Sequence, residues 1–102
     1  MIAELTVHRR EVVALCQRFG VRRLAVFGSA TTNRFDAAHS DIDFLVELEP
    51  PAESSRFDAF FGFKEALEAL LARPVDLVDP SALDNPYFAA MVKPTIQELY
   101  AA

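Results

Sequence analysis

The chain has 102 residues, of which 52% are hydrophobic, and a formal net charge of −5 at pH 7. Its length predicts one globular domain, residues 1–102, and its hydrophobic content argues against wholesale disorder. No apolar run is long enough for a membrane helix, the first residues lack the pattern of a signal peptide, and an acidic surface repels nucleic acid. The single cysteine is typical of a reducing compartment. We therefore expect a cytoplasmic protein that binds neither membranes nor, stably, nucleic acid.

The first part of the chain predicts a helix followed by a strand. An apolar stripe with helical spacing is formed by Val12, Leu15, Cys16 and Phe19. Gly20 follows, where the end of a helix favours a residue that adopts the left-handed conformation. Residues 21–28, VRRLAVFG, are typical of a strand with a fully apolar end. Small and polar residues then indicate a turn over residues 28–40, with room for one short helix.

The rest of the chain predicts two strands and two helices. Residues 41–48, DIDFLVEL, form a second strand that a pair of prolines ends, and residues 55–72 have a strong helical pattern. Within residues 73–80, RPVDLVDP predicts a short third strand between two prolines. Residues 86–100 predict a last helix that is interrupted or begun at Pro94. This order indicates an α/β domain in which helices cover a sheet of three or more strands.

Two carboxylates stand at the head of the second predicted strand. Asp41 and Asp43 would share one face of that strand, about 7 Å apart, because successive side chains alternate. Burying either carboxylate without a partner is unfavourable. Solvent, a basic partner or a divalent cation could each resolve this conflict, and Mg²⁺ favours such carboxylate oxygens. Taken alone, the Asp-x-Asp pattern is equally consistent with two exposed acids at the end of a strand.

The Gly-Ser pair that ends the first strand makes the cation interpretation more specific. Gly28 lets the backbone approach a phosphate closely, and Ser29 adds a hydroxyl group. Asp76, in the middle of the third strand, is the best candidate for the third acid of a two-metal site. Its alternative role is an acid on an edge strand that faces solvent. Together these residues predict a phosphate-binding turn beside a cation site.

These motifs resemble those of a known family. The stretch FGSATTNRFDAAHSDIDFLV is similar to the signature of the minimal nucleotidyltransferases of the DNA polymerase β-like superfamily. The later LEALLARPVDLVD is similar to the third-acid element of that family, and the closing AMVKPTIQELYAA to the C-terminal helix of its small antitoxin members. The resemblance implies the polymerase β-like nucleotidyltransferase fold, an α+β arrangement in which helices flank a small mixed sheet.

The resemblance also implies a role for each site residue. The catalytic acids and metal ligands that it implies are Asp41, Asp43 and Asp76, which would hold two Mg²⁺ ions. Gly28 and Ser29 would contact the β- and γ-phosphates of ATP, and Arg34 would contact the triphosphate. The implied reaction is the attack of a hydroxyl group on the α-phosphate of ATP, with release of pyrophosphate.

Many minimal members of this family are partners of HEPN-domain toxins, and some transfer AMP to a tyrosine of the toxin. The resemblance therefore implies an antitoxin with a HEPN partner and leaves room for an oligomer in that complex. A second hypothesis is a weak or inactive antitoxin that neutralises the toxin by direct binding. It is favoured by Ala30 directly after the Gly-Ser pair and by the single arginine, Arg34, among the eleven residues between Ser29 and Asp41. Transfer to a small molecule is a third hypothesis, disfavoured because we expect no second domain to hold the acceptor.

A cluster of phenylalanines stands out in the predicted helix over residues 55–72. Four of them occur within seven residues: Phe57, Phe60, Phe61 and Phe63. Four aromatic side chains so close together cover most of the circumference of a helix. They indicate either a deeply buried helix or an exposed apolar surface for a partner.

Overall fold

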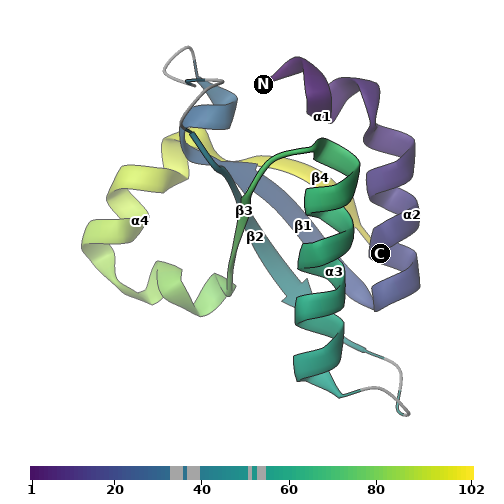
Figure 1. Ribbon diagram of the computed structural model, residues 1–102. Coiled ribbons are helices and arrows are strands. Elements are labelled where there is room, and N and C mark those ends of the chain that lie inside the picture. The colour runs from purple at the N-terminus through teal and green to yellow at the C-terminus, as the bar shows by residue number, and fades with distance from the viewer. Residues whose placement is uncertain (33–35, 37–39, 51, 53–54) are drawn as a thin grey trace.

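The computed structural model describes the chain except for residues 33–35, 37–39, 51 and 53–54. The strands within the described residues are β1 (Val21–Phe27), β2 (Ile42–Leu48), β3 (Val75–Val78) and β4 (Gln97–Ala101). They form one sheet with the order β3-β2-β1-β4 (Figure 1). β1 pairs antiparallel with both β2 and β4, whereas β2 and β3 run parallel, so the sheet is mixed.

The helices flank this sheet. The α-helices are α1 (Ala3–Val7), α2 (Arg9–Phe19), α3 (Arg56–Leu71) and α4 (Pro86–Val92). Short 3₁₀ helices are η1 (Gly28–Thr31), η2 (Pro80–Asp84) and η3 (Lys93–Thr95). The described part of the chain contains no helix with the length and apolar character needed to cross a bilayer.

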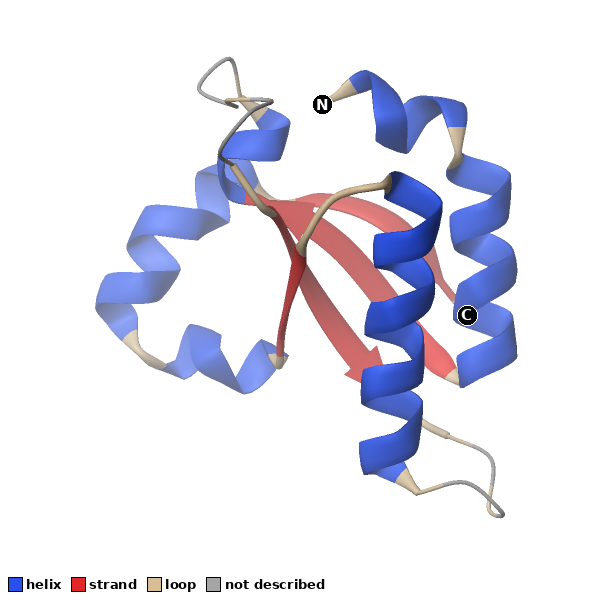
Figure 2. Cartoon of the chain, in the orientation of Figure 1, coloured by secondary structure: helices blue, strands red, loops and turns tan. Residues whose placement is uncertain are grey.

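The main core lies between one face of the sheet and helices α1, α2 and α3, which Figure 2 shows together on one side of the strands. Phe44 of β2 and Phe63 of α3 are the largest side chains that are fully buried there. Gly62 allows α3 to approach α2, because a Cβ atom at this position would lie 2.7 Å from Cε1 of Phe19. The rings of Phe19 and Phe63 are 6.0 Å apart, so aromatic contact joins the two helices.

A smaller apolar cluster lies on the opposite face of the sheet, where α4 and η2 pack. Its buried members are Phe27, Leu45 and Val92. The ring of Phe88 on α4 meets the ring of Phe27 edge-on, with 5.8 Å between their centroids. This cluster holds α4 and η3 against the end of β1, and therefore beside the turn that follows it.

The helices and strands predicted between residues 12 and 78 are confirmed, whereas the predicted turn over residues 28–40 lies partly outside the described residues. α2 ends at Phe19, and Gly20 adopts the left-handed conformation with φ of 71°. The predicted strands appear as β1, β2 and β3, and the long helix appears as α3, whose first turn is capped by the Ser55 hydroxyl. The predicted α+β arrangement, a small mixed sheet flanked by helices, is also confirmed.

The predicted last helix over residues 86–100, interrupted or begun at Pro94, is confirmed for its first part and wrong for residues 97–100. The helix α4 ends at Val92, and the chain then forms β4 along β1. Because Pro94 cannot donate to an α-helical ladder, the chain after Val92 forms the short 3₁₀ helix η3 and becomes extended at the β-branched Ile96. As a strand, this segment satisfies the free edge of β1 and buries Leu99.

Candidate active site

Two of the predicted acids lie side by side on neighbouring strands. In the parallel ladder between β2 and β3, Asp43 is the partner of Asp76. On its other side Asp43 pairs with Phe27, the last residue of β1. Residues opposite one another in a ladder project their side chains to the same face of the sheet. Two carboxylates that the sequence separates by more than thirty residues are thus brought together at one end of the sheet.

The remaining predicted acid, Asp41, lies just outside β2. β2 begins at Ile42, so Asp41 belongs to the segment before it and is exposed to solvent. Its negative charge nevertheless acts on Asp43, as does that of Asp76. The structure therefore brings the three predicted acids into one electrostatic group with Asp43 at its centre.

Asp43 has an unfavourable environment for a negative charge. Partial burial raises the pKa of its carboxyl group above the ordinary value of 3.8, and the negative charges of Asp76 and then Asp41 raise this pKa further. In the described part of the chain, the recorded ion pairs join other residues and leave all three carboxylates without an arginine or lysine partner. A bound cation would relieve this repulsion.

The donor set suits a hard divalent cation. Carboxylate oxygens are the ligands that Mg²⁺ favours, and it usually binds one or two of them together with water and phosphate oxygens. Across the described residues, no three His, Cys, Asp or Glu side chains form a ready cluster that could hold a metal ion. The arrangement fits an ion that reaches its full coordination only with oxygens from a substrate, rather than a closed protein cage.

The predicted phosphate turn lies directly beside Asp43. Gly28 follows β1 with φ of 74°, a conformation that L-residues rarely adopt. A Cβ atom at Gly28 would lie 3.0 Å from Oδ2 of Asp43. Glycine is therefore required here both by the backbone conformation and by the close carboxylate. Its contribution to the site is the space that a side chain would have filled.

The Gly28–Thr31 turn is held from within and from outside. The Thr31 hydroxyl donates a hydrogen bond to the carbonyl oxygen of Gly28 at 3.0 Å. The Ile2 amide donates to the carbonyl oxygen of Ala30 at 2.9 Å, and Ala30 is fully buried. The Ser29 side chain is partly exposed, and its hydroxyl has no recorded hydrogen bond to the described residues. Ser29 is thus the member of the turn that is free to bind a ligand.

Thr95 is a site residue that the sequence analysis missed. Its Oγ1 accepts a hydrogen bond from the Gly28 amide at 2.8 Å and donates one to the carbonyl oxygen of Val92 at 2.7 Å. A continuous helix over residues 86–100 would have carried Thr95 away from the sheet, whereas Thr95 ends the 3₁₀ helix η3 just before β4. The signals that could have found it are Pro94, which cannot continue an α-helix, and the β-branched Ile96, where the extended chain begins.

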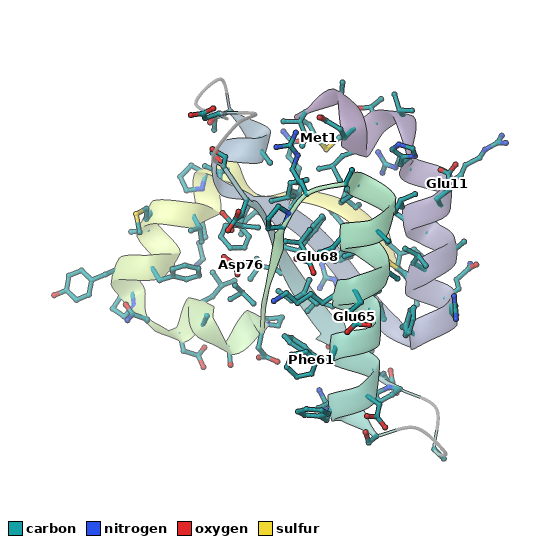
Figure 3. The ribbon with its side chains drawn as sticks, viewed as in Figure 1. Met1, Glu11, Phe61, Glu65, Glu68 and Asp76 are labelled. Atoms are coloured by element: carbon teal, nitrogen blue, oxygen red, sulfur yellow. The ribbon has the colours of Figure 1, made fainter. Side chains whose placement is uncertain are left out.

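The start of β3 is fixed by a side chain of α3. Oε2 of Glu68 accepts a hydrogen bond from the Val75 amide at 3.1 Å, one residue before Asp76. Figure 3 shows Glu68 on α3 and Asp76 on the neighbouring β3. On the other side, the Ile42 amide donates to the carbonyl oxygen of Pro74 at 3.2 Å. These two bonds set the register that places Asp76 opposite Asp43.

Arg34, the predicted triphosphate ligand, lies outside the described residues. Its role stays a prediction, as do those of Asp41, Asp43, Asp76, Gly28 and Ser29. The structure brings Asp41, Asp43, Asp76, Gly28 and Ser29 to one end of the sheet, around the turn after β1.

Comparison with known sequences identifies relatives over most of the chain. A family model described as the nucleotidyltransferase domain matches residues 10–99. The protein adenylyltransferase MntA of Thermococcus cleftensis is 45% identical over 82 residues, covering 79% of this chain and 75% of that protein. A Methanocaldococcus jannaschii protein, provisionally described as a protein adenylyltransferase, is 36% identical over 90 residues, covering 88% of this chain and 84% of that protein.

Solved structures share the fold. One provisionally described as a minimal nucleotidyltransferase superposes with a TM-score of 0.70 at 33% identity, covering 91% of this chain and 90% of that one. A second comes from a complex of a tri-AMPylated Shewanella oneidensis HEPN toxin with an MNT antitoxin. It has a TM-score of 0.61 at 19% identity and covers 95% of this chain and 72% of that one. At so low an identity, the second likeness is one of fold alone.

Proposed function

This chain belongs to the nucleotidyltransferase domain family, and from that premise we propose that it transfers AMP from ATP to a hydroxyl group of a partner protein. The acceptor that we propose is a tyrosine of a HEPN toxin, which makes the chain an antitoxin of the cytoplasm. Relatives named as protein adenylyltransferases, at 45% and 36% identity, support the transfer of AMP to protein. The complex of a HEPN toxin with an MNT antitoxin of the same fold supports the partner.

The observation that carries this proposal is the pairing of Asp43 with Asp76 beside Gly28. The carboxylates of Asp43 and Asp76 in register, with Asp41 also acting on Asp43, concentrate negative charge at the end of the sheet. The Gly28 backbone approaches that charge so closely that no side chain fits between them. A site of this kind suits cations that bind to the protein and to a triphosphate at the same time.

In the proposed reaction, the acceptor oxygen forms a bond to the α-phosphorus of ATP. The bond from that phosphorus to its bridging oxygen breaks, and pyrophosphate leaves with the electron pair. Asp76, exposed on β3, takes the hydroxyl proton, while Ser29 binds the β- and γ-phosphates. Asp41, Asp43 and Asp76 would hold the Mg²⁺ ions. When bound, these ions supply charge stabilisation for the phosphoryl oxygens.

An exposed aromatic surface on α3 offers the partner an apolar contact. Phe57 is 69% exposed and Phe61 is 43% exposed, with 4.6 Å between their ring centroids. A hollow of about 300 Å³ beside them is lined by Val46, Leu48, Arg56, Phe57, Phe60 and Asp79. Phe63, in contrast, is fully buried in the main core. The phenylalanine cluster thus serves both the core and the surface, and we propose that its exposed part contacts the toxin.

The test is AMP transfer from α-labelled ATP in the presence of Mg²⁺ and a HEPN partner, followed by mass spectrometry of the modified peptide. The double variant Asp41→Asn, Asp43→Asn should lose activity by about 10³-fold or more, because metal-assisted charge stabilisation contributes several kcal/mol. Asp76→Asn should also lose most of the rate. Asp84→Asn, which removes an exposed acid of η2, is the matched control and should remain active.

Persistence of labelling in the double variant would show that the metal assignment is wrong. A wild-type protein that never labels its partner but neutralises it in cells, as does the double variant, would instead support an antitoxin that acts by binding. The single arginine between Ser29 and Asp41 favours that second function.

A further inference from the structure

The turn after β1 is held by a hydrogen bond to Thr95, a residue near the C-terminal end of the chain. The Gly28 amide and Oγ1 of Thr95 are 2.8 Å apart, although 67 positions separate these residues in the sequence. In the antiparallel ladder between β1 and β4, Val26 is the partner of Gln97. Gly28 lies two residues after Val26, and Thr95 lies two residues before Gln97. At this position of the ladder the Gly28 amide donates to the Thr95 side chain instead of to a backbone carbonyl group. The Thr95 hydroxyl therefore adds one hydrogen bond to the ladder between β1 and β4, at the residue where the chain leaves β1.

The geometry of the Thr95 hydroxyl is itself fixed. A hydroxyl group has one proton to donate, and that of Thr95 goes to the carbonyl oxygen of Val92 at 2.7 Å. Its lone pairs are then left to accept the Gly28 amide proton. Val92 is buried in the smaller apolar cluster together with Phe27, so the end of α4 has little freedom to move. The Gly28 turn is thus connected to a packed element rather than to a mobile side chain.

The position of Gly28 matters because of what lies on its other side. The place of a Gly28 Cβ atom is 3.0 Å from Oδ2 of Asp43, so the backbone and the carboxylate are in near contact. Ser29 follows directly and is partly exposed. A shift of Gly28 away from β4 or toward Asp43 would change the distance between the free Ser29 hydroxyl and the acids.

We infer that Thr95 is a positioning residue of the nucleotide site, which holds the Gly28 backbone against Asp43 so that Ser29 faces the triphosphate. This inference rests on the proposed function, because it assigns Thr95 to the binding of the same nucleotide. The Gly28 amide is taken by Thr95, so the phosphate contact of this turn falls to Ser29. Thr95 acts through the turn and makes no contact with the reacting atoms.

The experiment compares Thr95→Val, which keeps the shape and loses both hydrogen bonds, with Thr95→Ser, which keeps the hydroxyl group. Loss of a positioning hydrogen bond should raise the KM for ATP by about tenfold in Thr95→Val and lower kcat much less. Thr95→Ser should restore the wild-type KM. By NMR, the Gly28 amide should exchange with solvent about tenfold faster in Thr95→Val.

The matched control is Ser55→Ala. The Ser55 hydroxyl also accepts a backbone amide proton, that of Asp58 at 2.9 Å, but it caps α3 at the opposite end of β2 from Asp43. This variant should lose stability without a change in the KM for ATP. A KM that rises equally in both variants would reduce the role of Thr95 to general stability and overturn the inference.

Other outcomes separate this inference from the proposed function. An unchanged KM in Thr95→Val, or a Thr95→Ser variant as impaired as Thr95→Val, overturns the positioning role while AMP transfer stands. If the wild-type protein transfers no AMP, calorimetry of MgATP binding replaces KM. Weaker binding in Thr95→Val then supports the inference although the proposed reaction has failed. Equal binding in both proteins, or no binding in either, overturns it.

Discussion

The two faces of the sheet differ in composition, and β2 shows the difference within a single strand. One face of β2 carries Ile42, Phe44, Val46 and Leu48, all buried under the helices α2 and α3. The other carries Asp43, Leu45 and Glu47, of which Leu45 alone is buried. Apolar burial, the main favourable contribution to folding, is therefore concentrated on one face. This leaves the other face able to tolerate clustered carboxylates.

The face of the sheet that carries Asp43 also has a small apolar cluster. The cluster around Phe27, Leu45 and Val92 packs α4 against it, and the candidate site begins where that cluster ends. The fold thus places a small packed cluster next to carboxylates that repel one another. If this comparison is correct, substitutions on the two faces should have opposite effects on stability and on activity.

The largest expected effect on stability comes from the helix-covered face. Phe63→Ala removes a fully buried ring from the main core and should lower the free energy of unfolding by about 3–5 kcal/mol. Urea denaturation measures this loss. Phe61→Ala, two positions away and 43% exposed, is the control and should change stability far less. Equal losses would contradict the assignment of stability to the buried side of α3.

A smaller effect on stability is expected at the hydrogen bond by which Glu68 of α3 holds the start of β3. Glu68→Ala removes the acceptor of the Val75 amide and should lower the free energy of unfolding by about 1 kcal/mol. Because this bond sets the position of Asp76, the rate of AMP transfer should also fall, by about tenfold. Glu68→Gln keeps a carbonyl acceptor and should recover most of both losses.

The control for Glu68 lies on the same helix. Glu65 is exposed on α3, one turn earlier, and both residues are labelled in Figure 3. Glu65→Ala should leave stability and rate near those of the wild type. A Glu68→Gln variant as slow as Glu68→Ala would show that the charge of Glu68, rather than its hydrogen bond, matters for the site.

The smallest expected effect has the opposite sign. The pKa of Asp43 is raised in the folded protein, so this carboxyl group binds its proton more tightly when the chain is folded. Its favourable contribution is complete below the ordinary pKa of 3.8 and is lost as the pH rises through the raised value. In EDTA at neutral pH, Asp43→Asn should therefore be more stable than the wild type, although we expect this variant to be inactive.

Urea denaturation of the Asp43→Asn and wild-type proteins at a series of pH values measures this difference. The advantage of the variant should shrink as the pH falls toward 3.8. An advantage that stays constant with pH would come from packing rather than from charge, and would contradict the electrostatic difference between the two faces.

The sequence predicts well those parts of the fold that local signals determine. The apolar stripe before Gly20 and the prolines on either side of residues 75–78 lead to α2 and β3 as observed. The Asp-x-Asp pattern and the Gly-Ser pair also predict that Asp43 and Gly28 lie close together, as observed. The pairing of Asp43 with Asp76 depends on the contact between β2 and β3, which no local pattern encodes.

Long-range pairing also explains what the sequence analysis missed. Residues 97–101 contain helix-forming residues, and only the free edge of β1 turns them into a strand. Thr95 could not be placed at the site while that segment was taken to be helical. Its role depends on where Gly28 lies, 67 positions earlier in the chain.

The last strand has a consequence for how the molecule forms. All three candidate acids and Ser29 precede residue 77, and the Gly28 turn receives its support from Thr95 and β4. A polypeptide leaves the ribosome N-terminus first, and contacts this distant in sequence form late. During synthesis all candidate metal and phosphate ligands are therefore present before the contacts that position them have formed. The ability to bind a nucleotide should arise in one step, when the final strand pairs with β1.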